Sequence, residues 1–251
     1  MHFSRRALLV TIVIILGWSS AATSQGQMVH VFKQLPNTLS EKEKAAGWKL
    51  LFDGKTTDGW RGYKMDKMPP GWRVLDGALV KVKPGAGGKG AGGGDDIITV
   101  GQFDNFEFTV QWKIVSNGNS GILYRVTEGA ATSWHVAPEM QVLDNTKHPR
   151  RKKSQLAGAL YDLYAPAKDV TKPVGQWNTA KVVADGRRVE HWLNGVRLLA
   201  YELGTDDWNK RIAASKFKNM PKFAKAQKGH LCLQDHSDRI EFRNIKVRPL
   251  K

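Results

Sequence analysis

The sequence predicts an all-β protein whose antiparallel strands form two sheets packed face to face, a sandwich or jelly roll with one or two short helices. Between Phe106 and Ile114, apolar residues alternate strictly with polar ones, as expected for a strand with one buried face. Asp-Gly or Asn-Gly dipeptides, which favour two-residue hairpin turns, lie between apolar runs at 76–77, 185–186 and 194–195. Many short antiparallel strands, each with one polar face, imply two packed sheets.

The first residues resemble a secretory signal. Arg5 and Arg6 precede an apolar run from Ala7 to Trp18, and small residues follow, with cleavage expected after Ala22 or Ser24. The chain is therefore expected to be periplasmic or secreted. Ser4-Arg5-Arg6 leaves the twin-arginine route open as an alternative. No later apolar run has a membrane-spanning length, so no integral span is expected after signal removal.

The predicted organisation is a signal peptide at 1–24, an N-terminal segment with a short helix at 25–46, and one domain at 47–251. Ser40 and Glu43 form a capping box that opens the short helix, and Gly47 ends it. A second helix is expected at Thr205–Ala214. Beyond 106–114, strands are expected near residues 49–52, 97–100, 121–126, 136–143, 177–183 and 240–247.

The chain is basic, with 39 Lys and Arg against 23 Asp and Glu and a formal net charge of +16. Export and the scatter of these residues argue against a nucleic-acid partner and favour an anionic envelope or polymer as neighbour. The densest basic run, 147–153, is interpreted as a solvated loop, with a dedicated anion site as the alternative. The glycine-rich run 84–94 lacks the helix of a phosphate-binding loop and is interpreted as a flexible connection. Cys232 is the only cysteine, so no internal disulfide is expected.

Two predicted strands have carboxylate, amide or imidazole side chains at alternate positions. At 139–143 (EMQVL), Glu139 and Gln141 share one face, and the apolar residues between them face the core. At 229–236 (GHLCLQDH), two leucines face the core, and the opposite face carries His230, Cys232, Gln234 and His236. This pattern predicts a sheet with one apolar face and one chemical face.

Three familiar hydrolytic chemistries do not fit. The sequence has no Gly-x-Ser-x-Gly elbow and no His-Glu-x-x-His helix, and Cys232 has no identifiable activating partner. Glu139-x-Gln141-x-x-Asp144 is similar to the Glu-x-Asp-x-x-Glu strand of laminarinase-like glycosidases. However, an amide replaces the middle carboxylate, and Asp144 has the wrong strand parity unless a bulge redirects it. Ordinary retaining hydrolysis is therefore disfavoured.

Several long motifs, in order from about Gly47 to the end of the chain, resemble the 3-keto-disaccharide hydrolase family. They are GWKLLFDGKTTDGW (47–60), GNSGILYR (118–125), EMQVLDN (139–145), GALYDLYAP (158–166), VGQWNT (174–179), EHWLNG (190–195), GHLCLQDH (229–236) and FRNIKVR (242–248). The resemblance implies a concanavalin A-like jelly roll with a sugar site on its concave sheet. It also implies substrates already oxidised at C3 of the sugar ring.

A C3 ketone acidifies the C2 proton, so a base can eliminate the group at C1, and addition of water to the enone completes a net hydrolysis. Glu139 and His236 are the predicted base and acid. Arg125 is predicted to hold the ketone or enolate oxygen, and Gln141, Gln234 and Tyr161 to orient hydroxyl groups. Trp192, opposite the apolar face of its strand, is a predicted sugar platform.

The sequence requires no cofactor. A divalent metal is an open alternative, with Glu139, Asp144 and His236 as its potential ligands. The expected partners are 3-keto glycosides or other glycans, and no oligomeric state is predicted. The alternative function is a non-catalytic carbohydrate-binding module of the same fold.

Other polar and aromatic residues receive structural interpretations. Asn119 and Asp235 are expected to close turns, and His191 is expected to be a hydrogen-bonded core residue. The tryptophans at 60, 72 and 112 are expected in the core.

Overall fold

The computed structural model describes residues 20–22, 28–30, 34–82 and 95–250, and it divides into two units, Met1–Leu35 and Pro36–Lys251. In the first unit, β1 (Ser20–Ala22) pairs antiparallel with β2 (Met28–His30). The rest of the predicted signal peptide and the glycine-rich run at 84–94 lie outside the described residues.

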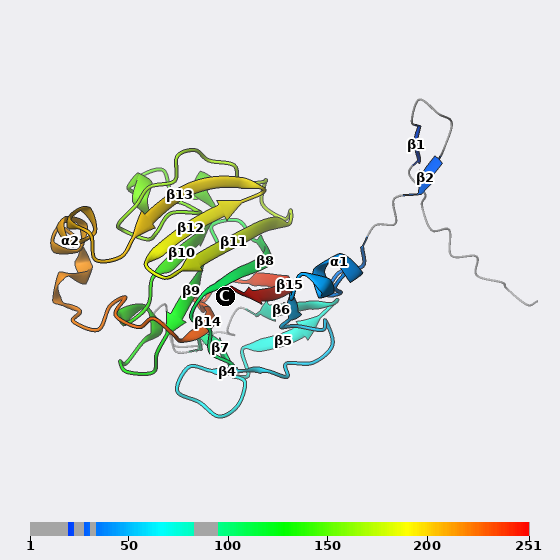
Figure 1. The fold of residues 1–251 in the computed structure, drawn as a ribbon, viewed down its shortest axis with the longest axis horizontal. Coiled ribbons are helices and arrows are strands. Elements are labelled where there is room, and N and C mark those ends of the chain that lie inside the picture. The colour runs from blue at the N-terminus through cyan, green and yellow to red at the C-terminus, as the bar shows by residue number, and fades with distance from the viewer. Residues whose placement is uncertain (1–19, 23–27, 31–33, 83–94, 251) are drawn as a thin grey trace, which may run out of the picture. The chain divides into compact units, whose positions relative to one another are not determined.

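The second unit is the predicted all-β jelly-roll sandwich of two antiparallel sheets (Figure 1). The five-stranded sheet has the order β10 (Glu139–Leu143), β9 (Asn119–Val126), β14 (His230–Leu233), β7 (Ile97–Thr99) and β4 (Trp60–Gly62). The eight-stranded sheet runs β13 (Val196–Glu202), β12 (Arg188–Leu193), β11 (Asn178–Asp185), β8 (Phe106–Ile114), β15 (Ile240–Pro249), β6 (Ala78–Lys81) and β5 (Trp72–Leu75), with β3 (Lys49–Leu50) on β15.

The core lies between the two sheets and confirms the predicted alternation. All five apolar residues of β8 are buried, whereas the four polar residues between them are half-buried. Met140 and Val142 of β10 enter the same cluster from the five-stranded sheet, as do the three tryptophans expected in the core. Each such side chain contributes about 1.5–3 kcal/mol by its burial, so this cluster holds the sheets together.

Hairpin turns join neighbouring strands at the predicted dipeptides. Asp76-Gly77 and Asn194-Gly195 have positive φ at both residues, as two-residue turns of this kind require. The third turn is one residue later than predicted. Asp185 pairs with Arg188 at the end of β11, so the turn consists of Gly186 and Arg187.

Both predicted helices are present, and the first has the expected capping box. α1 (Glu41–Ala45) begins with the Ser40 and Glu43 capping box, and α2 (Asp206–Ala213) begins at the N-cap Thr205. Among the described residues, short 3₁₀ helices lie in four loops: η1 (Ser133–His135), η2 (Asn145–Lys147), η3 (Lys153–Gln155) and η4 (Lys216–Asn219). Within the described ranges, no helix is long and apolar enough to cross a membrane.

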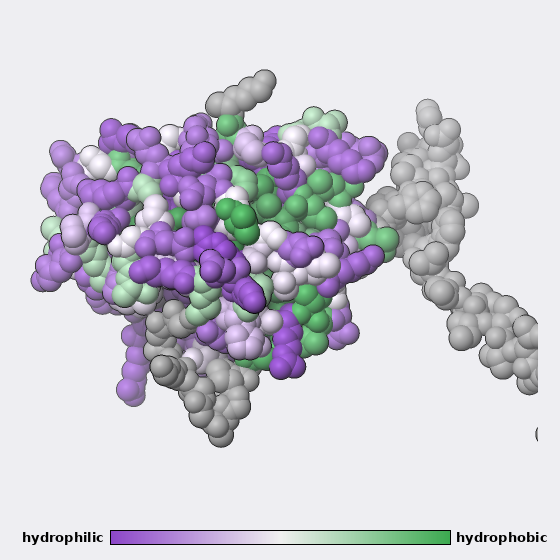
Figure 2. Space-filling model, turned by 90° about the horizontal axis from the view of Figure 1, so that it is seen from below, coloured by the Kyte–Doolittle hydropathy of each residue, from purple (hydrophilic) through white to green (hydrophobic). Residues whose placement is uncertain are grey.

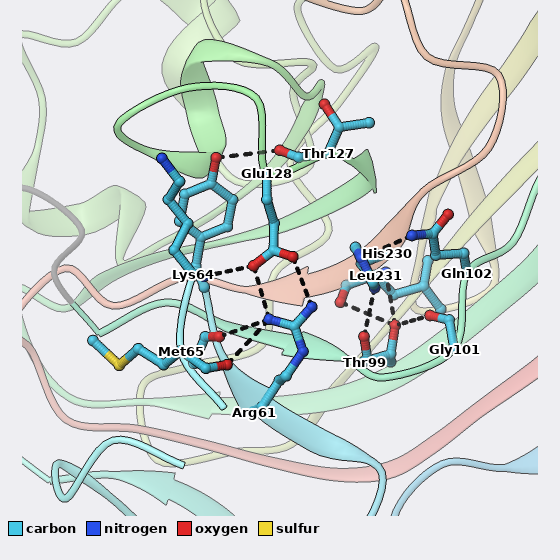
Figure 3. Close-up of polar contacts among 12 residues, drawn as sticks. Arg61, Lys64, Met65, Thr99, Gly101, Gln102, Thr127, Glu128, His230 and Leu231 are labelled. Carbon is cyan, nitrogen blue, oxygen red and sulfur yellow. Dashed lines mark hydrogen bonds and ion pairs between the residues drawn. The ribbon is translucent and has the colours of Figure 1, made fainter. Parts of the chain in front are cut away.

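The outward face of the five-stranded sheet is partly covered by the segment 127–138. An apolar cluster that includes Leu123, Val136 and Cys232 lies beneath this segment. The Arg61 guanidinium holds the segment to β4 by a two-pronged ion pair with Glu128, with N–O distances of 2.8 and 2.7 Å (Figure 3). The other end of the same sheet face is not covered by this cluster and carries the polar residues.

The exterior is mainly hydrophilic on the face drawn in Figure 2. Among the described residues, the large exposed hydrophobic side chains are scattered along the chain: Leu35, Met65, Leu75, Val100, Val115 and Val174. Scattered apolar residues of this kind are ordinary for a protein surface.

Candidate active site

A pocket of about 200 Å³ lies on the uncovered end of the five-stranded sheet. Its floor is formed by residues of β9, β10 and the segment after β14, and its walls come from η1, η4 and the chain that follows β10. The lining residues are Asn119, Trp134, Glu139, Gln141, Arg151, Tyr161, Lys216, Gln234, Asp235 and His236. The structure thus brings together five of the seven residues predicted for catalysis and substrate binding: Glu139, His236, Gln141, Tyr161 and Gln234.

The Glu139 carboxyl occupies space that a glycine provides on the neighbouring strand. A Cβ atom added to Gly121 would lie 2.5 Å from Glu139 Oε1. In the part of the chain that the structure describes, Glu139 forms no ion pair and its carboxyl accepts no hydrogen bond. Burial raises the pKa of Glu139 to about 7, so the group can exchange a proton near neutral pH.

The Gln141 side chain is fixed on the pocket floor. Its Nε2 donates to Asn119 Oδ1 at 2.7 Å and to the carbonyl of Val142 at 3.2 Å. These bonds leave the side-chain oxygen to accept from a hydroxyl group of a ligand. Asn119, which the sequence suggested as a turn residue, therefore belongs to the pocket.

Tyr161 reaches the pocket because its segment runs along the edge of β10. The Tyr161 amide donates to the carbonyl of Glu139 at 3.0 Å, and the Gly158 amide donates to that of Gln141 at 2.8 Å. The backbone therefore fixes Tyr161 beside Glu139.

A buried carboxylate joins two walls of the pocket. Asp96, which is 0% exposed, accepts hydrogen bonds from the Ser133 hydroxyl and, at 2.8 Å, from the Asp235 amide. Ser133 begins η1, which carries Trp134, and Asp235 lies between Gln234 and His236. Burial raises the pKa of Asp96 to about 6. Asp96 was not predicted from the sequence, because its role depends on contacts with residues far away in the chain.

Asp235 lines the pocket but is already paired. Its Oδ2 lies 3.1 Å from Nζ of the buried Lys81, which also contacts Asp95 at 3.1 Å. Its Oδ1 accepts from the Ser237 amide at 2.8 Å, which is the turn-closing role expected from the sequence. Both oxygens are therefore occupied.

Two basic residues that were not predicted from the sequence also line the pocket. Arg151 belongs to the basic run 147–153, and Lys216 begins η4. The Lys216 ammonium lies 4.3 Å from the ring centroids of both Trp134 and Tyr161, within cation–π range. Exposed basic residues are common in this sequence, so Lys216 could not be recognised as a pocket residue. For Arg151, the density of basic residues around it was the one available indication.

Arg125 lies away from the pocket, and the cause is a bulge in β9. His230 pairs with Val126, but Cys232 pairs with Leu123 instead of Tyr124, so β9 contains one extra residue here. Arg125 has a φ of 54° and donates to the carbonyl of Asp104 through Nε and Nη2 at 3.0 and 2.8 Å. Strict alternation along β9 would place Arg125 on the face of Gly121 and Leu123, and the bulge redirects it.

Trp192 and His230 also have other partners. Trp192 belongs to β12 of the larger sheet, where its indole nitrogen donates to Glu190 at 2.9 Å. His230 lies between Gln102, 3.0 Å from its Nε2, and the carbonyl of Thr99, 2.6 Å from its Nδ1 (Figure 3). The expectation for His191 is confirmed: it is buried between the Tyr124 hydroxyl and the Gly158 carbonyl.

The suggested metal ligands do not converge. Asp144 caps η2 by accepting from the Thr146 amide at 3.1 Å, and its other oxygen accepts from the Asn117 amide at 2.8 Å. Glu139 and His236 line the pocket without it. Across residues 34–82 and 95–250, no three His, Cys, Asp or Glu side chains form a cluster that could hold a metal ion. This donor set does not fit a metal centre.

Sugar-binding sites combine aromatic walls with amide and carboxyl groups that orient hydroxyls, and this pocket has both. The fold and the site define a carbohydrate-active protein of the jelly-roll class. The chain belongs to the family described as the 3-keto-alpha-glucoside-1,2-lyase-like domain, whose model matches residues 47–248.

Named relatives agree with this membership. The chain is 36% identical over 231 residues to the 3-keto-disaccharide hydrolase of Bacteroides thetaiotaomicron, with 82% of this chain and 79% of the relative covered. A solved structure from Parabacteroides distasonis, provisionally named a glycosyl hydrolase, is 35% identical with a TM-score of 0.78, covering 86% of this chain and 100% of that one. A second such structure from the same species is 25% identical with a TM-score of 0.63, covering 81% and 99%.

Proposed function

We propose that the protein cleaves glycosides already oxidised to a ketone at C3, by elimination followed by addition of water. The observation that carries this proposal is the Glu139 carboxyl, which is buried without an ion pair and has a pKa of about 7 among the polar and aromatic side chains of the pocket. A base of this kind suits removal of a carbon-bound proton that a neighbouring ketone has acidified.

In the first step, the Glu139 carboxylate takes the C2 proton, and the electrons of that C–H bond move to the C3 oxygen to form an enolate. The enolate then re-forms the ketone as the bond between C1 and the leaving oxygen breaks. His236, which lines the same pocket, gives a proton to that oxygen. The products are an enone and an alcohol.

In the second step, water adds to C1 of the enone, and protonated Glu139 returns its proton to C2. His236, which gave up its proton in the first step, removes the proton of the attacking water. Atoms and charges balance, and the net reaction is hydrolysis of the glycosidic bond. Both residues return to their starting states.

Lys216 is the group we assign to the enolate oxygen. Partial desolvation lowers the pKa of its ammonium, and the carboxylates of Glu139 and Asp162 oppose that shift. A positive charge near the base stabilises negative charge that develops on the substrate. Lys216 thus takes the role that the sequence suggested for Arg125.

A retaining glycosidase mechanism has less support. It needs a second free carboxylate beside the first, and Gln141 occupies that position on β10. Asp235 is the other carboxylate of the pocket, and both of its oxygens are occupied. The arrangement therefore favours a single base acting beside a ketone.

The test is turnover of a 3-keto disaccharide compared with the unoxidised disaccharide. We expect product from the keto sugar alone, and we expect Glu139→Gln and His236→Ala to abolish its formation while the protein stays folded by circular dichroism. Unchanged turnover in both variants would remove these residues from the site. Binding of plain glycans with no product from any keto sugar would instead support the carbohydrate-binding module.

We also propose that the chain acts in the periplasm or outside the cell. The support is the pattern at 1–24 of two arginines, an apolar run and small residues. Cell fractionation of the full chain tests this, since a cytoplasmic protein that keeps its first residues would contradict it.

A further inference from the structure

Arg151 is held in the pocket wall by a structured loop. Asn145 Oδ1 accepts from the Ala157 amide at 2.9 Å, which ties the start of the loop to its end. The Arg151 amide donates to the carbonyl of His148 at 3.1 Å, and Gln155 Nε2 donates to Asp162 at 3.0 Å. Arg151 is therefore half-buried in a structured loop, whereas most of the basic run 147–153 is exposed, as expected from the sequence.

The two cations of the pocket are not in close ion pairs. Among the residues that the structure describes, neither Arg151 nor Lys216 forms an ion pair within 4.0 Å. Asp162, near the mouth, accepts from Gln155 and lies 3.9 Å from Lys152. Asp235 is paired with Lys81 behind the pocket wall, and Asp95 shares the same ammonium.

Glu139 does not balance this charge at neutral pH. Its pKa of about 7 means that roughly half of the molecules carry a neutral carboxylic acid there. The wall that carries Arg151 and Lys216 therefore presents two cations without an ion-paired carboxylate, which favours an anionic ligand on that side of the pocket.

The proposed reaction uses only one of these two cations. It develops one negative charge at a time, first on the enolate oxygen and then on the leaving oxygen. One cation, Lys216, serves the enolate, and His236 protonates the leaving oxygen. A neutral sugar would thus leave the guanidinium of Arg151 without a charged partner.

We propose that Arg151 forms a subsite for an oxyanion group carried by the substrate, so that the preferred glycosides are acidic, as in sugars with a carboxylate or a sulfate. The planar fork of a guanidinium matches two oxygens of such a group, which a neutral hydroxyl cannot supply. This inference rests on the proposed function, since it names the substrate class of the same pocket.

The experiment compares matched 3-keto disaccharides that are neutral, carry a uronic-acid carboxylate, or carry a sulfate ester. We expect the wild type to have the higher kcat/KM for at least one acidic substrate. Arg151→Gln should lower the ratio of acidic to neutral kcat/KM by about tenfold or more, the effect of losing a charged hydrogen bond to the oxyanion. The carboxylate and sulfate arms identify which oxyanion the subsite takes.

Arg150→Gln is the matched control. Arg150 precedes Arg151 in the same loop, is exposed and does not line the pocket. The substitution removes the same charge, so we expect the ratio of acidic to neutral kcat/KM to stay near that of the wild type. If Arg150→Gln and Arg151→Gln change this ratio equally, general surface charge explains the preference, and the subsite is overturned.

The subsite and the proposed function fail in different ways. Turnover of the neutral keto sugar, with no preference for either acidic one, would overturn the subsite and leave the function standing. If no keto sugar is turned over, calorimetric titration with glucuronate and glucose still tests the subsite. Binding of glucuronate that is stronger than that of glucose and lost in Arg151→Gln supports it, and equal binding of the two sugars overturns it.

Discussion

The carboxyl of Glu139 on β10 lies against the bare backbone of Gly121 on β9, where a Cβ atom would come within 2.5 Å of Glu139 Oε1. The two strands pair in register, with Gly121 opposite Gln141 and therefore diagonal to Glu139. Any larger residue at 121 would displace the proposed base.

Gly121→Ala should therefore impair turnover of a 3-keto disaccharide while leaving the fold intact. A displacement of about 1 Å of the base can cost on the order of 100-fold in rate. Kinetics and circular dichroism check this. Gly129→Ala is the control, because its added Cβ would have ordinary contacts at 3.6 Å and the residue lies outside the pocket. Full activity in Gly121→Ala would mean that the position of Glu139 is unimportant.

The pKa of Glu139 predicts a pH dependence of the rate. Elimination needs the carboxylate of Glu139, so on the acid side of the profile kcat/KM for a keto sugar should rise with pH around a midpoint near 7, and Glu139→Gln should lower kcat/KM at least about 100-fold. A pH profile of single-turnover rates tests both points. A rate that is flat between pH 5 and 9 would be inconsistent with Glu139 as the base.

The same pKa predicts an effect on stability. The folded-state pKa of about 7 lies above the ordinary value of 4.5, so the folded protein binds more protons than the unfolded chain between these pH values. Stability is therefore lost as pH rises through this range, by up to about 3 kcal/mol from this group. Glu139→Gln has no such loss, so its melting temperature relative to wild type should increase from pH 5 to pH 8. A difference that does not change with pH would contradict the raised pKa.

Asp96 should matter because it connects η1 to the segment that carries Gln234 and His236. Asp96→Ala removes the acceptor of the Asp235 amide and of the Ser133 hydroxyl, and we expect a loss of about 1–3 kcal/mol in the free energy of unfolding and a raised KM. Asp96→Asn can still accept from the amide and donate to the hydroxyl oxygen, so it should retain most activity. Denaturant unfolding and steady-state kinetics compare the two. Equal damage by both variants would point to a need for the charge itself.

Lys216→Met should lower kcat more than it raises KM, because the proposed contact with the enolate oxygen forms only as charge develops. Lys216→Arg should recover part of the rate. Lys218→Met, in the same 3₁₀ helix but outside the pocket, serves as the control. A change in KM alone would assign Lys216 to ground-state binding.

Turnover should persist in the presence of a chelator. The carboxylate oxygens of Asp144 accept from backbone amides, and the donor set suggested from the sequence does not assemble. Steady-state rates with and without EDTA check this expectation. Activity lost in EDTA and restored by a divalent cation would show that other residues form a metal site.

Residue patterns along the chain predicted the sandwich, the capping box of α1, two of the three hairpin turns and the side of β10 on which Glu139 and Gln141 lie. These features depend on period-two alternation and on neighbouring residues, which a sequence displays directly. The family motifs likewise lie in continuous segments, so they identified the class of substrate to test.

Tertiary structure alone decided which charged residues meet in the pocket. A bulge of one residue turned Arg125 away, and the folding of distant loops brought in Arg151 and Lys216. A bulge changes strand parity without a distinctive composition, and contacts between residues far apart in the chain leave no local pattern. For these reasons the proposed base could be predicted from the sequence, but the cations around it could not.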